Sequence, residues 1–259
     1  MHNKLTDELA VCGLNAALAV CEHHPETVNR LFLREDRLKL FTGICKQLAE
    51  RKRPYKICLD EELERISKSV HHQGVVAMIE EPVVAPLSRE ELDEWAEEGK
   101  TGVLLHSVGN DHNLGAIARA AAFFDVDFLI LNENDSEARL STSAYRVAEG
   151  GLEHIATRKI TNSAAFLKDA SKRIITAAAD VRARLRIRDF DSVLREKSAK
   201  LRRGGRAGVV LVLGNEETGL PSDVKNQCSC LFRIPGTGKI ESLNVAQAAA
   251  LFLHELYEL

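Results

Sequence analysis

The sequence has few aromatic residues and no long apolar run. Aromatic side chains make up 5% of its 259 residues, although 45% of the residues are hydrophobic. No apolar stretch approaches the roughly 20 residues that a membrane-spanning helix needs, and residues 1–8 lack the apolar core of a signal peptide. We therefore expect a cytoplasmic protein, without membrane association, built of one large or two modest globular domains.

Paired cysteines are also missing. None of the six cysteines forms a C-x-x-C pair, and all lie in apolar surroundings; they are Cys12, Cys21, Cys45, Cys58, Cys228 and Cys230. This distribution argues against a zinc knuckle and against a disulfide framework. We expect buried, reduced thiols and no bound metal.

The net charge is only −3, so the total gives no argument for nucleic-acid binding, but the charge is unevenly distributed. Residues 182–206 form a basic segment with ten cationic side chains against three acidic ones. Two interpretations stay open for it: a solvated helix face with long side chains, or a surface that binds phosphate groups.

An acidic stretch, residues 90–98, follows Pro82 and Pro86. The composition of residues 83–100 predicts an acidic linker that contains a short solvated helix. This linker divides the chain into residues 1–82 and residues 101–259.

The part before the linker alternates between helical and strand-like patterns, which predicts a compact α/β domain of about 80 residues. We expect helices over residues 13–21, 38–50 and 61–67, and strands over residues 28–33, 55–59 and 74–79.

The alternation restarts after the linker on a larger scale, which predicts an α/β domain with a mainly parallel sheet and helices on both faces. The expected strands are residues 103–108, 126–131, 173–178 and 209–213, and the expected helices are residues 114–124, 163–170, 193–201 and 243–257. Ligands of such sheets bind beyond the carboxyl ends of the strands.

Two glycine-rich turns, residues 214–219 and 236–238, follow apolar segments. The first has the glycine spacing of a P-loop, but Leu220 and Pro221 replace the lysine and hydroxyl residue that contact phosphate and magnesium. In the second, Glu241 replaces the third glycine of a dinucleotide fingerprint. A P-loop is therefore excluded, and a nucleotide-dependent oxidoreductase is strongly disfavoured.

Together with a third polar cluster, these turns resemble the SpoU family of knotted RNA 2'-O-ribose methyltransferases. The first family motif, N-x-G-A-x-x-R-x-A, is matched by Asn113, Gly115, Ala116, Arg119 and Ala121. The second, L-G-x-E-x-x-G-L, is matched by Leu213, Gly214, Glu216, Gly219 and Leu220. The third, I-P followed by S-L-N-V, is matched by Ile234, Pro235, Ser242, Leu243, Asn244 and Val245.

The resemblance extends to the first domain, where residues 13–18 and 72–77 are similar to the two ends of the RNA-binding domain that many members carry. It implies a ribosomal-protein-like substrate-binding domain over residues 1–82 and a methyltransferase domain with a deep trefoil knot over residues 101–259. It also implies a homodimer formed through the second domain, with ribosomal or transfer RNA as substrate.

S-adenosylmethionine is the cofactor that the resemblance implies, bound mainly by backbone groups. Its contacts would fall on Leu213, Gly214, Gly219, Ile234, Leu243 and Val245, although the side chains of Ile234 and Leu243 could serve only core packing. Catalysis would rest on Arg119, Asn113, Glu216, Ser242 and Asn244.

The chemistry implied is attack of a ribose 2'-hydroxyl on the sulfonium methyl group. Because arginine stays protonated in proteins, we expect Arg119 to orient the hydroxyl and stabilise its developing negative charge. We expect Glu216 to lie beside Arg119 and to orient either the arginine or the RNA. Asn113 would stand at the N-cap of its helix and position Arg119 or the ribose, and Ser242 and Asn244 would complete a polar rim.

The sequence departs from the family pattern at Asn110, Asp111 and Asp125. Many members have Asp-Pro where this chain has Asn110 and Asp111, and a glycine where it has Asp125. Because Arg119, Glu216 and Asn244 all remain, we still expect an active enzyme. The alternative is a noncatalytic RNA-binding or ribosome-assembly protein that retains the methyltransferase fold.

Overall fold

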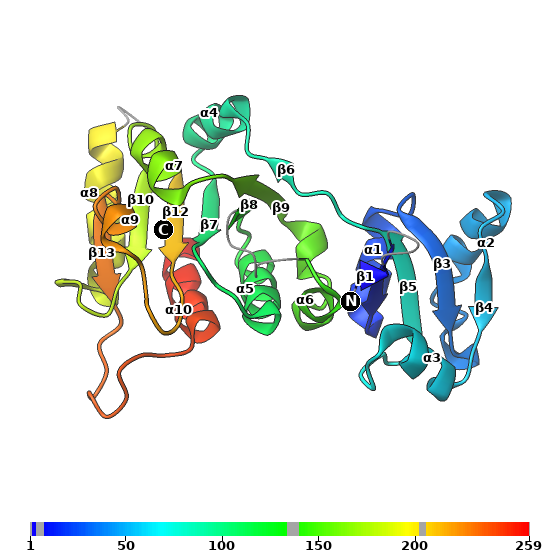
Figure 1. Cartoon of the computed structure of the whole chain (residues 1–259). Coiled ribbons are helices and arrows are strands. Elements are labelled where there is room, and N and C mark those ends of the chain that lie inside the picture. Colours follow the sequence, from blue (N-terminus) through cyan, green and yellow to red (C-terminus); the bar gives the residue numbers. More distant parts are fainter. Residues whose placement is uncertain (1, 4–7, 134–139, 202–205, 259) are drawn as a thin grey trace. The chain divides into compact units, whose positions relative to one another are not determined.

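The structure, a computed structural model, describes residues 2–3, 8–133, 140–201 and 206–258 (Figure 1). The chain divides into two compact units. Unit 1 comprises Met1–Val83 together with Arg139–His154, and unit 2 comprises Val84–Ala138 and Ile155–Leu259. The second piece of unit 1 lies far from the first in sequence, so this unit is discontinuous.

Unit 1 is built on a five-stranded sheet with the order β1-β2-β5-β3-β4. Only β3 and β4 are parallel neighbours, and the other pairs are antiparallel. The strands are β1 (His2–Asn3), β2 (Glu8–Cys12), β3 (Val28–Leu33), β4 (Tyr55–Ile57) and β5 (Val75–Glu80). β2 was not predicted, because its apolar run continues into the next helix with only Gly13 between them.

The first piece of unit 1 also holds α1 (Leu14–His23), η1 (Glu35–Arg37), α2 (Thr42–Glu50) and α3 (Asp60–Ser67). The apolar side chains of β2, β5 and α3 form a core cluster that includes Cys12, Leu63 and Val76. The predicted α/β pattern of this part is thus confirmed, with helix and strand ends shifted by a few residues.

The second piece of unit 1 consists of α6 (Thr142–Ala148) and η2 (Gly151–His154), which contact α1. The amide of Asn15 on α1 donates to Glu149 at 3.3 Å. Gly150 has φ +93°, and a β-carbon there would lie 2.9 Å from the β-carbon of Ala19. Only a glycine therefore lets this segment approach α1 so closely.

Unit 2 is built on an eight-stranded sheet in which every neighbouring pair is parallel. Its order is β11-β13-β10-β12-β7-β8-β9-β6. The strands are β6 (Ala85–Pro86), β7 (Thr101–Leu105), β8 (Phe128–Asn132), β9 (Ala156–Ile160), β10 (Ile175–Ala179), β11 (Leu185–Arg186), β12 (Val209–Leu213) and β13 (Cys230–Arg233). The predicted parallel α/β fold is confirmed.

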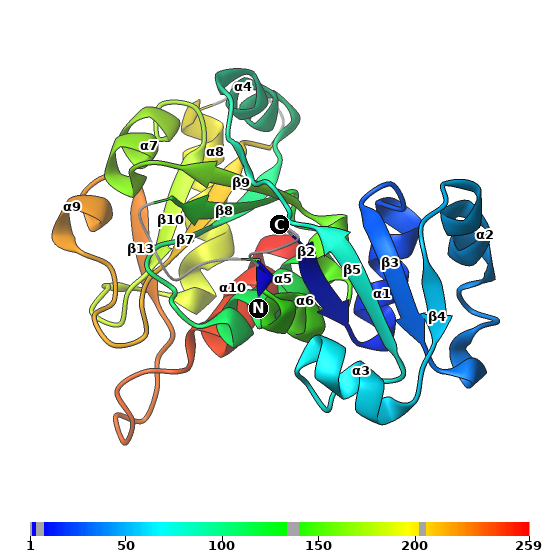
Figure 2. The ribbon, with the colours of Figure 1, turned by 45° about the vertical axis from the view of Figure 1, so that its right-hand side comes forward.

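Helices cover both faces of this sheet (Figure 2). One face carries α4 (Arg89–Glu98), α7 (Ser163–Ala170) and α9 (Ser222–Lys225), whose apolar residues share a core cluster with the strands. The other carries α5 (Asp111–Phe123), α8 (Phe190–Leu201), which follows η3 (Ile187–Asp189), and α10 (Val245–Tyr257). Phe190 of α8 contacts both Phe232 of β13 and Phe252 of α10, which joins these elements on one side.

The acidic segment between β6 and β7 differs from the solvated linker helix that we expected. It forms α4, which starts with a capping box between Ser88 and Glu91. Trp95 of α4 is buried, stacks on Phe128 at 4.7 Å and donates its indole N–H to the carbonyl oxygen of Lys100 at 2.8 Å. Glu90, Glu94, Glu97 and Glu98 are exposed, whereas the half-buried Glu91 and Asp93 pair with Arg158 at 2.7 Å and with Arg173 at 2.9 Å. The apolar side of α4 is part of the core of unit 2.

The fit of Trp95 depends on two glycines beneath it. A β-carbon at Gly102 would lie 2.3 Å from the indole ring, and one at Gly208 would lie 2.7 Å from it. These distances are too short for a non-bonded contact, so a side chain at either position would displace the tryptophan.

The cysteines are free thiols, as predicted, and all are buried except the half-buried Cys228. Burial raises the pKa of Cys21 to about 12 and that of Cys230 to about 11, so both thiols stay protonated. Within the described ranges, no three His, Cys, Asp or Glu side chains are grouped as a metal site requires. None of the described helices is long and apolar enough to cross a membrane. The trefoil knot stays a prediction.

Candidate active site

The first two motifs meet because β7 and β12 are neighbours in the sheet. Leu105, at the end of β7, pairs with Leu213, at the end of β12. The ladder continues one step further, where the N–H of His106 donates to the carbonyl oxygen of Leu213 at 2.9 Å. The segments that follow these strands therefore start side by side at the same edge of the sheet.

The turn after β12 folds back on itself. The N–H of Gly219 donates to the carbonyl oxygen of Asn215 at 2.9 Å. A β-carbon at Gly214 would lie 2.7 Å from the carbonyl carbon of Gly219, and Gly219 itself has φ +66°. The two glycines of the second motif thus have separate purposes: Gly214 permits a close backbone approach, and Gly219 adopts a left-handed conformation.

The side chain of Asn215 stabilises this turn through hydrogen bonds to backbone groups. Its side-chain oxygen accepts the backbone N–H groups of Glu217 at 2.9 Å and Thr218 at 3.1 Å. Its amide nitrogen donates to the carbonyl oxygen of Ser107 at 2.9 Å, which ties the turn to the loop after β7. Ser107 has φ +54°, a conformation uncommon for a residue other than glycine.

Sequence reasoning missed Asn215, because it occupies a variable position of the second motif. The available signal was an asparagine directly after a glycine at the end of a strand, since asparagine commonly bonds to backbone groups a few residues ahead in turns. That signal predicts the turn but not the bond to Ser107.

The first motif lies on α5, which starts one turn earlier than expected. Asn110 is the N-cap, and its side-chain oxygen accepts the N–H of His112 at 2.8 Å. The prediction that Asn113 caps the helix is therefore wrong, because the helix already includes it. Asp125, where the family has a glycine, has φ +55°, a conformation that Asp tolerates better than most residues.

Because Asn113 does not cap the helix, its side chain is able to bond to two other segments. Its amide nitrogen donates to Glu216 in the turn after β12. Its oxygen accepts a hydrogen bond from the amide nitrogen of Asn244 at 3.0 Å. Asn244 is the N-cap of α10, because its own oxygen accepts the N–H of Ala246 at 2.9 Å.

These bonds form a chain from Glu216 through Asn113 to Asn244, with one member from each of the three motifs. Each amide donates on one side and accepts on the other, so the orientation of both asparagines is fixed. The structure thus brings together three of the five predicted catalytic residues.

The other two, Arg119 and Ser242, are solvent-exposed. Arg119 lies on α5, six residues after Asn113, and Ser242 lies two residues before Asn244. Glu216 bonds to Asn113, whereas the expected pairing of Glu216 with Arg119 stays a prediction.

The predicted cofactor contacts lie on β12, on its turn and on the segment from β13 to α10. Leu213 and Val245 are buried, Ile234 is half-buried, and Leu243 is 46% exposed. Core packing therefore does not account for Leu243. Residues 234–244 form a long loop that extends away from the sheet, and residues 235–244 are exposed (Figure 1).

A comparison of the sequence with protein families matches residues 100–254, more than half of the chain, to the SpoU rRNA methylase family. The chain belongs to the SpoU rRNA methylase family. Residues 10–84 match a second family described as RNA 2'-O ribose methyltransferase substrate binding. The resemblance based on the three motifs is thus confirmed.

Relatives match this SpoU chain over almost its whole length. The 23S rRNA (guanosine-2'-O-)-methyltransferase RlmB of Acinetobacter baylyi is 30% identical over 94% of both chains. RlmB of Bordetella pertussis is 29% identical over 95% of both chains.

Solved SpoU structures have the same fold. AviRb of Streptomyces viridochromogenes, in complex with S-adenosylmethionine, has a TM-score of 0.74 at 20% identity and covers 98% of this chain and 91% of its own. An S-adenosylmethionine-bound rRNA methyltransferase of Sinorhizobium meliloti has a TM-score of 0.72 at 21% identity, over 98% of this chain and 88% of its own. The family match and the RlmB relatives make the chain an RNA methyltransferase, and S-adenosylmethionine is the methyl donor of its family.

The close approach at Gly214 gives a direct test of the turn. Gly214→Ala should force the backbone of Gly219 outward, because the new methyl group has no space. We expect a loss of stability of about 1–3 kcal/mol and a weakening of S-adenosylmethionine binding by about tenfold or more. Calorimetric titration of the cofactor measures the second effect.

Gly43→Ala is the matched control, since a β-carbon at Gly43 on α2 has no atom within 4 Å. This change should raise the stability by up to about 1 kcal/mol, as expected for alanine in place of glycine in a helix, and leave cofactor binding unchanged. Unaltered binding in Gly214→Ala would contradict the assignment of this turn to the cofactor.

Proposed function

We propose that this SpoU protein methylates the 2'-hydroxyl of a guanosine ribose in large-subunit ribosomal RNA. The structural observation that carries the proposal is the hydrogen-bonded chain from Glu216 through Asn113 to Asn244, which joins all three motifs at one edge of the sheet. The choice of ribosomal over transfer RNA is supported by the RlmB proteins, which the chain matches over 94–95% of their length.

The residues at this edge suit S-adenosylmethionine. A β-carbon at Gly219 or Gly236 would meet no atom within 4 Å, so the main chain is open to a ligand on both segments. Backbone donors and acceptors suit the neutral adenine and the amino-acid tail of the cofactor. The residues that would hold it are Leu213, Gly214, Gly219, Ile234, Leu243 and Val245.

When bound, the cofactor supplies a methyl group on a sulfonium, which is already a good leaving group. The protein must place the ribose hydroxyl in line with that methyl group and stabilise the negative charge that develops on the oxygen. Arg119 is the residue assigned to this charge, because a guanidinium stays protonated and has several N–H donors.

Asn113 and Glu216 hold the base of the site in one arrangement. Since the amide nitrogen of Asn113 is engaged by Glu216 and its oxygen by Asn244, Asn113 fixes the distance between the turn after β12 and the start of α10. Ser242, two residues before Asn244 on the exposed loop, is assigned to the polar rim that the RNA contacts.

Recognition of the RNA is assigned to the first domain. The substrate-binding family matches residues 10–84, which agrees with a domain over residues 1–82 followed by the segment 83–100 and the methyltransferase domain over residues 101–259. The structure adds residues 139–154 to the first unit, so part of the sequence matched to the methylase family folds with the RNA-binding sheet.

We also propose a homodimer formed by the outer surface of α5 and α10. Large apolar side chains are exposed there: Phe123 is 80% exposed, Tyr257 59% and Leu251 45%. Phe124 links the two helices, because its ring contacts both Phe123 and Tyr257. An exposed apolar group of this kind typically marks a protein interface.

Transfer of a labelled methyl group from S-adenosylmethionine to total RNA tests the function, with the modified ribose mapped by its resistance to alkaline cleavage. Arg119→Ala should reduce transfer by about 100-fold or more and leave cofactor affinity within about twofold, because a lost oxyanion donor costs roughly that much. Arg89→Ala, at an exposed arginine of α4, is the control and should retain full activity.

No transfer to any RNA, despite cofactor binding, would overturn the catalytic proposal and favour the noncatalytic alternative. Loss of both transfer and cofactor affinity in Arg119→Ala would instead show that Arg119 has a structural role.

Asn244→Asp separates the role of Asn244 in the site from its role as a helix cap. Aspartate still accepts the N–H of Ala246, so stability should change by less than about 0.5 kcal/mol. The donor to Asn113 is lost, and methyl transfer should fall about 10- to 100-fold, as expected when a positioning contact is removed.

Asn162→Asp is its matched control, since Asn162 caps α7 by accepting the N–H of Ala165 at 2.8 Å. Equal losses of activity in the two variants would refute the assignment of Asn244 to the site.

The molar mass of the protein in solution tests the proposed dimer. Light scattering should give a molar mass of two chains, and Phe123→Asp should give a single chain by placing a charge in the apolar contact. A wild-type protein with the mass of one chain at micromolar concentration would contradict the dimer.

A further inference from the structure

The first part of the basic segment has an alternating pattern that the function above does not use. Between Asp180 and Asp189, every second residue is an arginine, and the residues between them are apolar. Arg182, Arg184 and Arg188 are exposed, whereas Ala183 is buried and Leu185 and Ile187 are half-buried; Arg186 is half-buried as well. We call Arg182, Arg184, Arg186 and Arg188 the arginine row.

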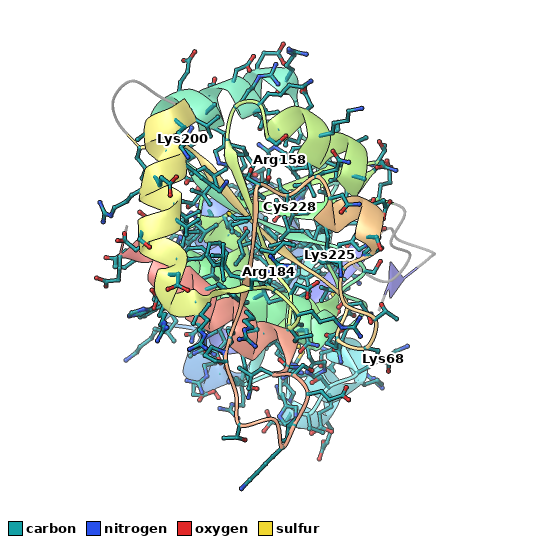
Figure 3. The ribbon with its side chains drawn as sticks, turned by 90° about the vertical axis from the view of Figure 1, so that its left-hand side faces the viewer. Lys68, Arg158, Arg184, Lys200, Lys225 and Cys228 are labelled. Carbon is teal, nitrogen blue, oxygen red and sulfur yellow. The ribbon has the colours of Figure 1, made fainter. Side chains whose placement is uncertain are left out.

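The arginine row lies at one edge of the sheet of unit 2. Arg186 of the row lies on β11, the edge strand. Because β11 pairs with β13, Arg186 lies opposite Arg233. The loop 234–244, which carries Ile234 and Ser242, starts immediately after Arg233. Figure 3 faces this edge, with Arg184 on the side from which the loop leaves and Lys200 at the far end of α8.

The acidic groups next to the row are already engaged. Asp180 binds Lys225 at 2.8 Å and accepts the backbone N–H of Arg182 at 2.7 Å. Burial alone would raise the pKa of Asp180, but these bonds hold it below its usual value. Asp189 accepts the backbone N–H of Arg186 at 3.0 Å and lies 3.7 Å from Arg188.

A large positive excess remains after these pairings. The four arginines of the row, with Lys225 and Arg233, give six cations against Asp180 and Asp189. Among the described residues, no carboxylate lies within ion-pair distance of the guanidinium groups of Arg182, Arg184 and Arg233, and the buried Nε of Arg233 has no hydrogen-bond partner. This edge of the sheet therefore attracts anions.

The second part of the basic segment is different. On α8, Arg195 binds Asp191 at 2.6 Å, and Lys200 binds Glu196 at 2.5 Å. The bond from Lys200 lowers the pKa of Glu196, which keeps the pair ionised. Arg202 and Arg203 lie outside the described residues. The structure thus divides the segment into an arginine row with excess charge and a helix whose charges largely neutralise one another.

We propose that the arginine row binds successive phosphate groups of the RNA backbone beside the methyl-donor loop. Arg182 lies in a turn, Arg186 on β11 and Arg188 in η3, so the row places four cations close together in sequence along one edge of the sheet. Such a concentration of positive charge suits a polymer with a phosphate on every residue. Guanidinium groups bind phosphate through paired N–H donors, which favours arginine over lysine. The proposal deepens the proposed function, because it rests on RNA as the substrate, and it places RNA on the second domain as well as on the first.

The test is the salt dependence of RNA binding by the full chain. Anisotropy of a labelled single-stranded RNA of about 20 nucleotides is followed between about 50 and 200 mM salt. The triple variant R182Q/R184Q/R188Q should bind more weakly by about tenfold or more, and the slope of log affinity against log salt should fall by about 2, since each lost phosphate contact removes about 0.7.

The matched control R195Q/K197Q/K200Q removes the same charge from α8. Its slope should change by less than about 1, because two of its three cations are already paired within the helix. The variant R182K/R184K/R188K keeps the charge of the row and should keep the salt slope. S-adenosylmethionine affinity and the midpoint of thermal unfolding show that each variant is folded; if the glutamine triple is not, Arg184→Gln alone should lower the slope by about 0.7.

Equal slope changes in the glutamine triple and its control would overturn the proposal, as would no change in either. Polyglutamate that binds the row as tightly as the RNA does would also overturn it in favour of an acidic protein partner. Failure of the proposed function gives a different result: RNA bound through the arginine row, with normal salt dependence, but no methyl group transferred to it.

Discussion

The hydrogen-bonded chain from Glu216 through Asn113 to Asn244 is the constraint on which the candidate site depends. Asn113 is 103 residues from Glu216 and 131 residues from Asn244, so only the tertiary fold joins them. The chain closes because β7 and β12 are adjacent parallel strands and because α5 packs beside α10. The geometry of the site therefore depends directly on the order of the strands in the sheet.

Unit 2 also depends on three glycines at which the backbone lies close to other atoms. Gly214 lets the turn after β12 fold against Gly219, while Gly102 and Gly208 make space for the indole of Trp95. In a chain with so few aromatic residues, this single tryptophan anchors α4 across the strands that lead to the site. The architecture of unit 2 thus requires the absence of a side chain at three positions in addition to its apolar strands.

The sequence predicted best those elements whose ends are marked by flanking residues, such as Gly208 and Gly214 around β12 and Asn162 before α7. The apolar run of β12 and the helix α7 were predicted at their true ends, and the three motifs led to Asn113, Glu216 and Asn244. β9, which is half-buried and contains Arg158 and Lys159, has no clear apolar pattern and was not predicted. In α4 the acidic residues outnumber the apolar ones, so the apolar pattern of its buried side was not recognised in the sequence.

Contacts between distant residues were beyond prediction from one sequence. Neither the bond between Asn215 and Ser107 nor the partner of Asn113 leaves a local signal, because each depends on which strands become neighbours. The basic segment differs in this respect, because the pairs Asp191 with Arg195 and Glu196 with Lys200 on α8 are local i,i+4 contacts that follow once the helix is placed. The place of the arginine row at the sheet edge, by contrast, depends on which strands become neighbours.

The discontinuity of unit 1 sets an order on how the protein is made. The five strands of its sheet leave the ribosome early, but α6 and η2, which contact β2 and α1, are synthesised only after β7, α5 and β8 of the other unit. Until then the surface of α1 that receives Gly150 stays uncovered. The first unit therefore cannot complete its own packing until α6 and η2 have been synthesised, and cutting the chain at residue 83 would separate its sheet from these two elements.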